Sequence, residues 1–224
     1  MLKLFIIGFT AIALALILPS IVVAEPSAKI IQHTGYIDVS GIYHVVGVVK
    51  NTGNQPLGFV TISVQFYDEN GNVIAADRVF TRIHVLLPDQ MSPFDATALG
   101  SDIVENIHRY EISAVAQVAK EKPQALRLQS SMSYIDDLGL YHVIGKVAND
   151  GNRHSTYTDV VATFYDEEGR IVTTGRDLTE PLNIPSGGEG AFKITVHRDL
   201  AGRIAKYSID AESNEFLTIK IYPS

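Results

Sequence analysis

An internal duplication constrains the fold of this chain more than any other feature of its sequence. Residues 36–54 align with residues 134–152 without a gap, and twelve of the nineteen positions are identical. Tyr36 and Tyr134 are 98 positions apart, and later segments keep this spacing. A repeat of this length can bury a core of its own, so it is a domain rather than one unit of a solenoid. We predict two similar domains, residues 25–122 and 123–224, behind an N-terminal segment at 1–24.

Each half has the pattern of antiparallel β-structure. Apolar residues occupy every second position from Val60 to Phe66, and again from Val160 to Phe164, as in strands with one buried face. Gly, Asn, Asp and Pro separate these runs at short intervals. The sequence therefore predicts an all-β chain of two tandem immunoglobulin-like antiparallel β-sandwich domains. Each half has room for one short helix, at 101–108 with Ser101 as N-cap, and at 199–205.

One predicted strand, residues 42–50, is apolar on both faces. Val45 and Val49 lie on one face, and Ile42 and Val46 lie on the other. Such a strand is usually covered on both sides, by a neighbouring loop or by the other half. If Ile42 and Val46, with Leu140 and Ile144 of the second half, form a contact between the halves, isolated halves will associate or aggregate.

The turns between the predicted strands are also repeated. Residues 51–54 and 149–152 contain Asn and Gly, and we expect them to supply backbone positions with positive φ. Residues 68–71 and 166–169 lie between apolar runs and are predicted to be hairpin turns.

The N-terminal segment has the character of an export signal. Residues 4–18 form an uncharged apolar run behind Lys3, Pro19 and Ser20 interrupt it, and a signal peptidase cut is expected after Ala24. An uncleaved anchor is the alternative, because residues 4–24 are just long enough to span a bilayer. In both cases the rest of the chain is expected outside the cytoplasmic membrane, as an extracellular or cell-envelope protein.

Composition excludes several classes of protein. The chain has no cysteine, which removes disulfide scaffolds, thiolate metal sites and cysteine nucleophiles. Its 18 basic and 25 acidic side chains give a net charge of −7, which argues against nucleic acid as a partner. The sequence contains none of the HExxH, GxSxG, GxGxxG or Walker A patterns. We therefore predict that the protein is not an enzyme, and we assign no catalytic, cofactor-binding or metal-binding residues.

Two repeated segments resemble a known family. Residues 64–74 and 162–172, each with a Phe-Tyr-Asp-Glu run followed by Gly, resemble the signature of FxLYD domains, small β-sandwich domains of exported prokaryotic proteins. Residues 47–54, 87–94 and 184–192 are similar to other parts of that pattern. Val64 and Ala162 stand where the family has Phe, and Phe66 and Phe164 stand where it has Leu. The resemblance implies a β-sandwich fold and an exported setting, and it implies no active-site residues.

The repeated histidines and acidic turns are candidates for binding a metal. His44 and His142 occupy the same place in both halves, as a metal ligand or pH sensor would. We favour a strand residue hydrogen-bonded to a neighbour, because no second ligand stands at metal-ligand spacing unless His84 or His154 comes close in space. The acidic residues at 68–69 and 166–168 suit calcium, but such side chains commonly cap turns.

Repeated aromatic residues are the best candidates for a recognition surface. Four point away from the buried faces of their strands: Phe59, Tyr67, Tyr157 and Tyr165. They form a recognition patch, or they cover a sheet edge or pack against the other half. Four further tyrosines are predicted to be core or corner residues: Tyr36, Tyr43, Tyr134 and Tyr141.

The sequence thus favours a non-catalytic exported protein that acts as an interaction or structural module at the cell envelope. The expected partner is a protein or another envelope component, with the membrane contacted only through residues 4–24 if they are not cleaved. The alternative is an envelope protein that binds a metal or small ligand through the repeated histidines or acidic turns.

Overall fold

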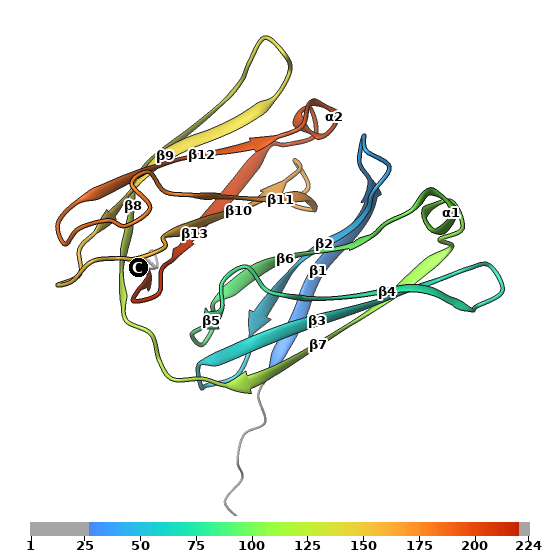
Figure 1. Cartoon of the computed structure of the whole chain (residues 1–224), viewed down its shortest axis with the longest axis horizontal. Coiled ribbons are helices and arrows are strands. Elements are labelled where there is room, and N and C mark those ends of the chain that lie inside the picture. Colours follow the sequence, from blue (N-terminus) through green and yellow to red (C-terminus); the bar gives the residue numbers. More distant parts are fainter. Residues whose placement is uncertain (1–26, 220–224) are drawn as a thin grey trace, which may run out of the picture.

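The computed structural model describes residues 27–219, so the expected export signal at 1–24 lies outside the described residues. The described chain is all-β, with fourteen strands and two short helices (Figure 1). Strand pairing is antiparallel except between β8 and β14. The prediction of an antiparallel all-β chain is confirmed.

The first half forms two sheets. Strands β1, β2 and β6 form one sheet in that order, and β3 pairs with β4, β5 and β7 in the other. The cores of the two sheets share one apolar cluster, which contains Val45 of β2, Ile62 and Phe66 of β3, and Phe94 of β6. The elements are β1 (Ala28–Ile37), β2 (Tyr43–Asn51), β3 (Leu57–Tyr67), β4 (Val73–Phe80), β5 (Val85–Leu86), β6 (Met91–Ala98), α1 (Ser101–Val104) and β7 (Arg109–Val118).

Within the described residues, the second half repeats most of this arrangement, but it has no counterpart of β5 and adds the short strand β14. Its sheet has the order β11-β10-β13-β14-β8-β9-β12, because the short β14 pairs with both β13 and β8. The first half has no counterpart of β14, since the chain there continues into the connection to β8. The elements are β8 (Gln124–Ile135), β9 (Tyr141–Asn149), β10 (Asp159–Tyr165), β11 (Ile171–Leu178), β12 (Glu189–Val196), α2 (Arg198–Ala201), β13 (Lys206–Glu212) and β14 (Leu217–Thr218).

The alternating patterns place the core as predicted. Val60, Ile62, Val64 and Phe66 of β3 are all buried, as are Val160, Ala162 and Phe164 of β10. Both faces of β2 are buried as well. Local period-two alternation therefore identified the central strands and their inward faces.

The outer face of β1 and β2 is covered by β10 and β11 of the second half. Val46, Val48 and Ile171 form one buried cluster, against which Tyr36 and Tyr165 pack. Of the four residues predicted for such a contact, only Val46 belongs to this cluster; Ile42, Leu140 and Ile144 do not.

Polar contacts reinforce the contact between the halves. The Gln32 amide donates to the Gly169 carbonyl at 3.2 Å and accepts from the Ile171 N–H at 2.9 Å. The Tyr36 and Thr173 hydroxyls lie 2.9 Å apart. Val161 of β10 and Leu217 of β14 also join the apolar cluster of the first half. The halves are thus packed together by apolar burial and by paired polar groups.

Several local predictions were wrong. Helix α1 ends at Val104 and is capped by Gly100 at φ 94, not by Ser101, because only glycine adopts that backbone conformation readily. Helix α2 begins at Arg198, with His197 as its N-cap. Tyr134, predicted to be a core or corner residue, is 39% exposed and is therefore not in the core.

The Asn-Gly turns differ from the prediction in their mechanism. Asn51 and Asn149 do not have positive φ; they are fully buried, and each side-chain amide donates to two backbone carbonyls. The hairpin turns at 68–71 and 166–169 are confirmed, and Gly71 and Gly169 have φ of 83° and 79°.

Candidate functional site: the junction groove

The four outward aromatics have two different environments. Phe59 is 69% exposed and Tyr157 is 52% exposed. Tyr165 instead packs on the cluster between the halves. Tyr67 is half-buried, lies under the Arg109 guanidinium at 3.9 Å and donates to Glu111 at 3.0 Å. Of these four residues, Phe59 and Tyr157 therefore present a largely free aromatic surface.

Phe59 and Tyr157 share an unusual backbone conformation. Their φ angles are 50° and 55°, in the left-handed region that side chains other than glycine rarely adopt. Phe59 lies in an irregularity of the β3–β7 pairing, between Gly58 and Thr61. Such bulges redirect a side chain away from the regular alternation of the strand. Both rings are exposed, Phe59 at the bulge of β3 and Tyr157 in the segment that precedes β10.

Phe59 and Tyr157 line two adjoining pockets that share His84. The first pocket has a volume of about 320 Å³ and is mainly apolar. The second has a volume of about 270 Å³ and is charged. We call the two together the junction groove, because residues of both halves line it. The first pocket is lined by Gly58, Phe59, Val60, Phe80, Thr81, His84, Val85 and Ala119, and the second by His84, Lys122, Tyr157, Asp159, Arg176, Glu212, Ser213 and Asn214.

The apolar pocket is built from aromatic residues of neighbouring strands. The rings of Phe59 and Phe80 meet edge to face, with centroids 6.5 Å apart, and Phe80 is 56% exposed. Ala119 lies at the start of the connection to the second half and touches the backbone at Gly58. This pocket offers an apolar anchor site with two ring faces at its edge.

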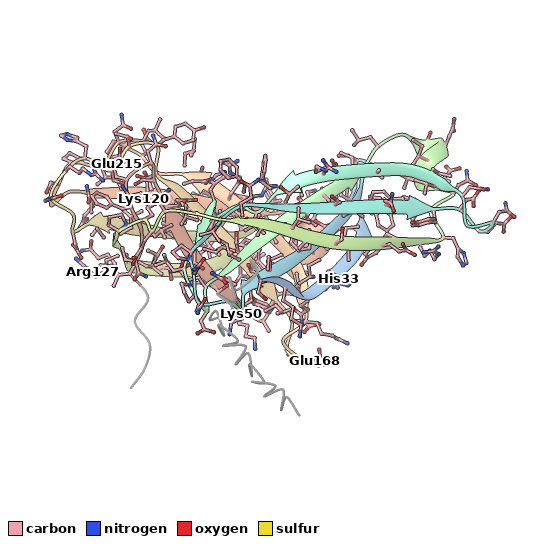
Figure 2. All side chains as sticks on the ribbon, turned by 90° about the horizontal axis from the view of Figure 1, so that it is seen from below. His33, Lys50, Lys120, Arg127, Glu168 and Glu215 are labelled. Carbon is pink, nitrogen blue, oxygen red and sulfur yellow. The ribbon has the colours of Figure 1, made fainter. Side chains whose placement is uncertain are left out.

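The charged pocket is organised by Glu212 at the end of β13. Its carboxylate is almost fully buried and accepts from the His84 N–H at 2.6 Å and the Val85 N–H at 3.3 Å. It also pairs with His84 Nδ1 at 3.0 Å and with the Lys122 ammonium at 2.6 Å. One carboxylate thus joins β13 to β5 and to the connection between the halves. Figure 2 places Lys120 of this connection at the same end of the molecule as Glu215.

These contacts shift the pKa values of the groups. Burial raises the pKa of Glu212, but the His84 hydrogen bonds and the Lys122 charge outweigh it, and the net pKa is lowered. The hydrogen bond to Glu212 raises the pKa of His84 against the opposing effect of burial. At neutral pH Glu212 is therefore ionised and held by its donors.

A second carboxylate lies beside Glu212. Asp159 of β10 is directly opposite Glu212 in the β10–β13 register and is 2.7 Å from the Arg176 guanidinium. Burial raises the pKa of Asp159, and Arg176 only partly offsets this effect. The acids and bases of this pocket compensate one another, so the groove combines an apolar pocket with an ionic wall of low net charge.

The repeated histidines are hydrogen-bonded strand residues. His44 Nδ1 lies 2.9 Å from Asp95 and its ring stacks on Tyr36. His142 Nε2 lies 2.8 Å from Asp136, and its Nδ1 lies 2.9 Å from the Thr195 hydroxyl. Within residues 27–219, no group of three or more His, Asp or Glu side chains is arranged to hold a metal ion.

The acidic turns are occupied by capping contacts. Asp68 accepts from the Asn72 N–H at 2.8 Å, and Asp166 accepts from the Arg170 N–H at 2.8 Å. Asp166 also pairs with the Arg170 guanidinium. These are the side-chain to backbone bonds that fix hairpin turns.

Sequence reasoning missed the Glu212 cluster. The available signal was a difference between the repeats: at the spacing that relates Tyr110 to Tyr207, Glu212 stands where the first half has Val115. A carboxylate in place of an apolar strand residue requires a partner. The partners come from β5 and from the connection, which only the fold brings together.

No protein-family model and no curated protein matches the chain. Solved structures with some similarity include the exo-chitosanase CsxA of Amycolatopsis orientalis, with a TM-score of 0.30 and 10% identity over 84% of this chain and 26% of the enzyme chain. A variant of that enzyme in complex with PNP-β-D-glucosamine gives the same values. The chain thus spans about a quarter of that enzyme, and a TM-score of 0.30 does not establish a common fold or activity.

In the described part of the chain, no helix has the length and apolarity needed to cross a membrane.

Proposed function

We propose that this chain is a non-catalytic exported protein whose two tandem immunoglobulin-like β-sandwich domains act as one interaction module at the cell envelope. The partner is a protein or another envelope component that docks at the junction groove. The observation that carries this proposal is the groove itself, where the exposed Phe59, Phe80 and Tyr157 gather at the meeting point of the two halves.

The conformation of the exposed aromatics supports recognition. A non-glycine residue at positive φ costs of order 1–3 kcal/mol and persists only where the surroundings hold it. Phe59 and Tyr157 have this conformation at repeat-equivalent positions, and both rings remain exposed. Strained, exposed aromatic residues have the features of binding anchors, which bury a large apolar area and lose little conformational entropy on binding.

The packing of the two halves supports a module that acts as one body. The apolar cluster around Val46 and Ile171, together with the Glu212 contacts, connects the halves at two separate places. A rigid junction holds the two walls of the groove in a fixed relative position. It therefore lowers the entropic cost of binding a partner.

Photo-crosslinking in the native envelope tests this proposal. A photoreactive phenylalanine analogue at position 80 should yield a discrete cross-linked species, identifiable by mass spectrometry. The same analogue at Val39, which is 62% exposed in the β1–β2 turn, is the matched control. Phe59→Ser should reduce the yield from position 80 at least several-fold. Equal patterns at positions 80 and 39, or no product at position 80, would contradict a partner at the groove.

A further inference from the structure

The contact between the halves joins two different sheet faces, and each face has a free counterpart. The β1–β2 face (Gln32, Thr34, Tyr36, Val46, Val48) is covered by the β10–β11 face (Tyr165, Gly169, Ile171, Thr173). In the second half, the counterpart of the β1–β2 face is the β8–β9 face. In the first half, the counterpart of the β10–β11 face is the β3–β4 face. Figure 1 shows these two counterparts on opposite sides of the molecule.

The β8–β9 face keeps the register of the covered β1–β2 face. Tyr36 pairs with His44 across β1 and β2, and Tyr134 pairs with His142 across β8 and β9. Here Met132, which stands where Thr34 does in the first half, is 59% exposed, and Tyr134 is 39% exposed. The β8–β9 hairpin therefore presents apolar and aromatic side chains at the positions that are covered in the first half.

The β3–β4 face likewise repeats the β10–β11 face. Tyr67 pairs with Val73, as Tyr165 pairs with Ile171. Ile171 is only 3% exposed because the first half covers it, whereas Val73 is 52% exposed. The same residue position is thus buried in one repeat and free in the other.

We infer that a second copy of this chain docks its β3–β4 face on the β8–β9 face, repeating between molecules the contact that joins the two halves. The two faces differ, so the contact is heterologous and leaves one free face at each end of the pair. Repetition of the contact produces a head-to-tail assembly rather than a two-fold symmetric dimer. This inference does not depend on the partner proposed for the junction groove.

Charge favours a second copy as the occupant. Lys146 stands where Val48 does in the first half. Within one molecule, Val48 pairs with Gln32, and the Gln32 side chain binds the turn at 169–171. The equivalent turn of the first half is at 68–73. If a second copy docks in the same way, Lys146 therefore lies beside the turn at 68–73 of that copy. That turn carries Asp68 and Glu69. Lys146 now pairs with Glu189 in an exposed ion pair, which costs little to exchange.

The contact between molecules should be weaker than the contact within one. Ala75 replaces Thr173 and Ser130 replaces Gln32, so the hydroxyl and amide bonds of the internal contact have no counterparts. The internal contact also benefits from the high effective concentration of a tethered partner. We expect reversible association that is favoured at high local concentration.

Cysteine cross-linking tests the inference, because the natural chain contains no cysteine. Two variants of the full chain, Val73→Cys and Ile144→Cys, are purified separately in mild detergent, mixed, and treated with a short bismaleimide. These positions correspond to Ile171 and Val46, which pack in one cluster. The mixture should give a cross-linked dimer at least fivefold above either variant alone, and a mixture of Val73→Cys with Leu99→Cys should give background yield. Met132→Cys, at a more exposed position, serves as a second probe if Ile144→Cys melts early.

The outcomes separate this assembly from its alternatives. Lys146→Glu placed in the Ile144→Cys variant should lower the mixed yield severalfold, and higher salt should lower the yield of the original pair. A mixed yield at the level of the Leu99→Cys control would overturn the inference. Ile144→Cys cross-linking to itself as fast as to Val73→Cys would also overturn it, since that result requires a symmetric contact.

Discussion

At the residue scale, the buried side chains of Asn51 and Asn149 hold together backbone segments beyond the turns in which they lie. Asn149 donates to the carbonyls of Arg153 and Ile184 and accepts from the Gly151 N–H. Asn51 makes the equivalent three bonds in the first half. Each asparagine thus ties its own turn to a backbone segment 35 positions further along the chain. The repeated Asn is therefore a structural element of the repeat rather than a turn former.

We expect Asn51→Ala and Asn149→Ala each to lower the free energy of unfolding by about 2–4 kcal/mol, because each removes three hydrogen bonds at a buried site. Chemical denaturation with matched controls at the exposed Asn54 and Asn152 measures this effect. Controls that lose as much stability as the buried positions would show that the turn sequence, and not the buried amide, is important.

The sequence does not distinguish these roles. Asn followed by Gly has the composition of a turn whether its amide faces water or the core. Burial of the amide depends on the β5 segment in the first half and on residue 184 in the second, which lie 35 positions further along the chain. Local patterns identify strands such as β3 and β10, whereas contacts of this range follow from the assembled fold.

At the element scale, the short strand β14 distinguishes the two halves. Phe216 precedes β14 and is buried against Gly151. A Cβ at Gly151 would lie within 2.7 Å of the Phe216 ring, whereas a Cβ at the equivalent Gly53 would have its nearest neighbour at 3.4 Å. The first half has Ala119 at the position of Phe216. Packing against Phe216 therefore requires glycine at position 151, whereas no such contact requires it at position 53.

Gly151→Ala should therefore destabilise the protein by about 1–3 kcal/mol through overpacking. Gly53→Ala should have little effect or a slight stabilising one, since alanine restricts the unfolded chain. Thermal melts of the two variants provide the comparison. Equal losses at both positions would contradict a specific role for Phe216.

The link between β5, β13 and the connection should depend on pH. Glu212 has a lowered pKa in the folded protein, so its contribution to stability is present above its ordinary pKa of 4.5 and is lost as pH falls through the lowered value. His84 has a raised pKa, so its contribution is present below its ordinary value of 6.5 and is lost as pH rises through the raised value. The link is strongest between these limits.

Glu212→Gln should accordingly lower the free energy of unfolding by about 2 kcal/mol near pH 5.5, because the amide cannot pair with two cations. The difference from the natural chain should shrink as the pH falls below the ordinary glutamate pKa of 4.5. It should decrease moderately as the pH rises above the ordinary histidine pKa of 6.5, because Lys122 and the backbone donors remain. Chemical denaturation at a series of pH values measures this difference in the free energy of unfolding, with Glu69→Gln at an exposed position as the control. A difference that does not vary with pH would contradict the assignment.

At the scale of the whole molecule, the differences between the repeats decide how the halves meet. Val48 and Lys146 occupy the same position, and only the apolar one is covered by the other half. Likewise Ile171 is buried and Val73 is not. The duplication predicted two similar units, and the apolar strand at 42–50 predicted that something covers its outer face. The covering surface did not follow from the sequence, because β10 and β11 carry no excess of apolar residues over β3 and β4.

The contact at Ile171 should determine whether the halves behave as one body. Ile171→Lys places a charge against Val46 and Val48, where burial of an isoleucine otherwise contributes about 1.5–3 kcal/mol. We expect the halves to separate while each retains its own core, since Ile171 lies in the cluster between them. Melting should change from one transition to two, and trypsin should cut faster after Lys120 in the connection. Val73→Lys, the same change at the exposed counterpart, should leave both measurements unchanged. A single transition with unchanged cleavage in Ile171→Lys would show that the Glu212 link and the packing of Val161 and Leu217 suffice to hold the halves together.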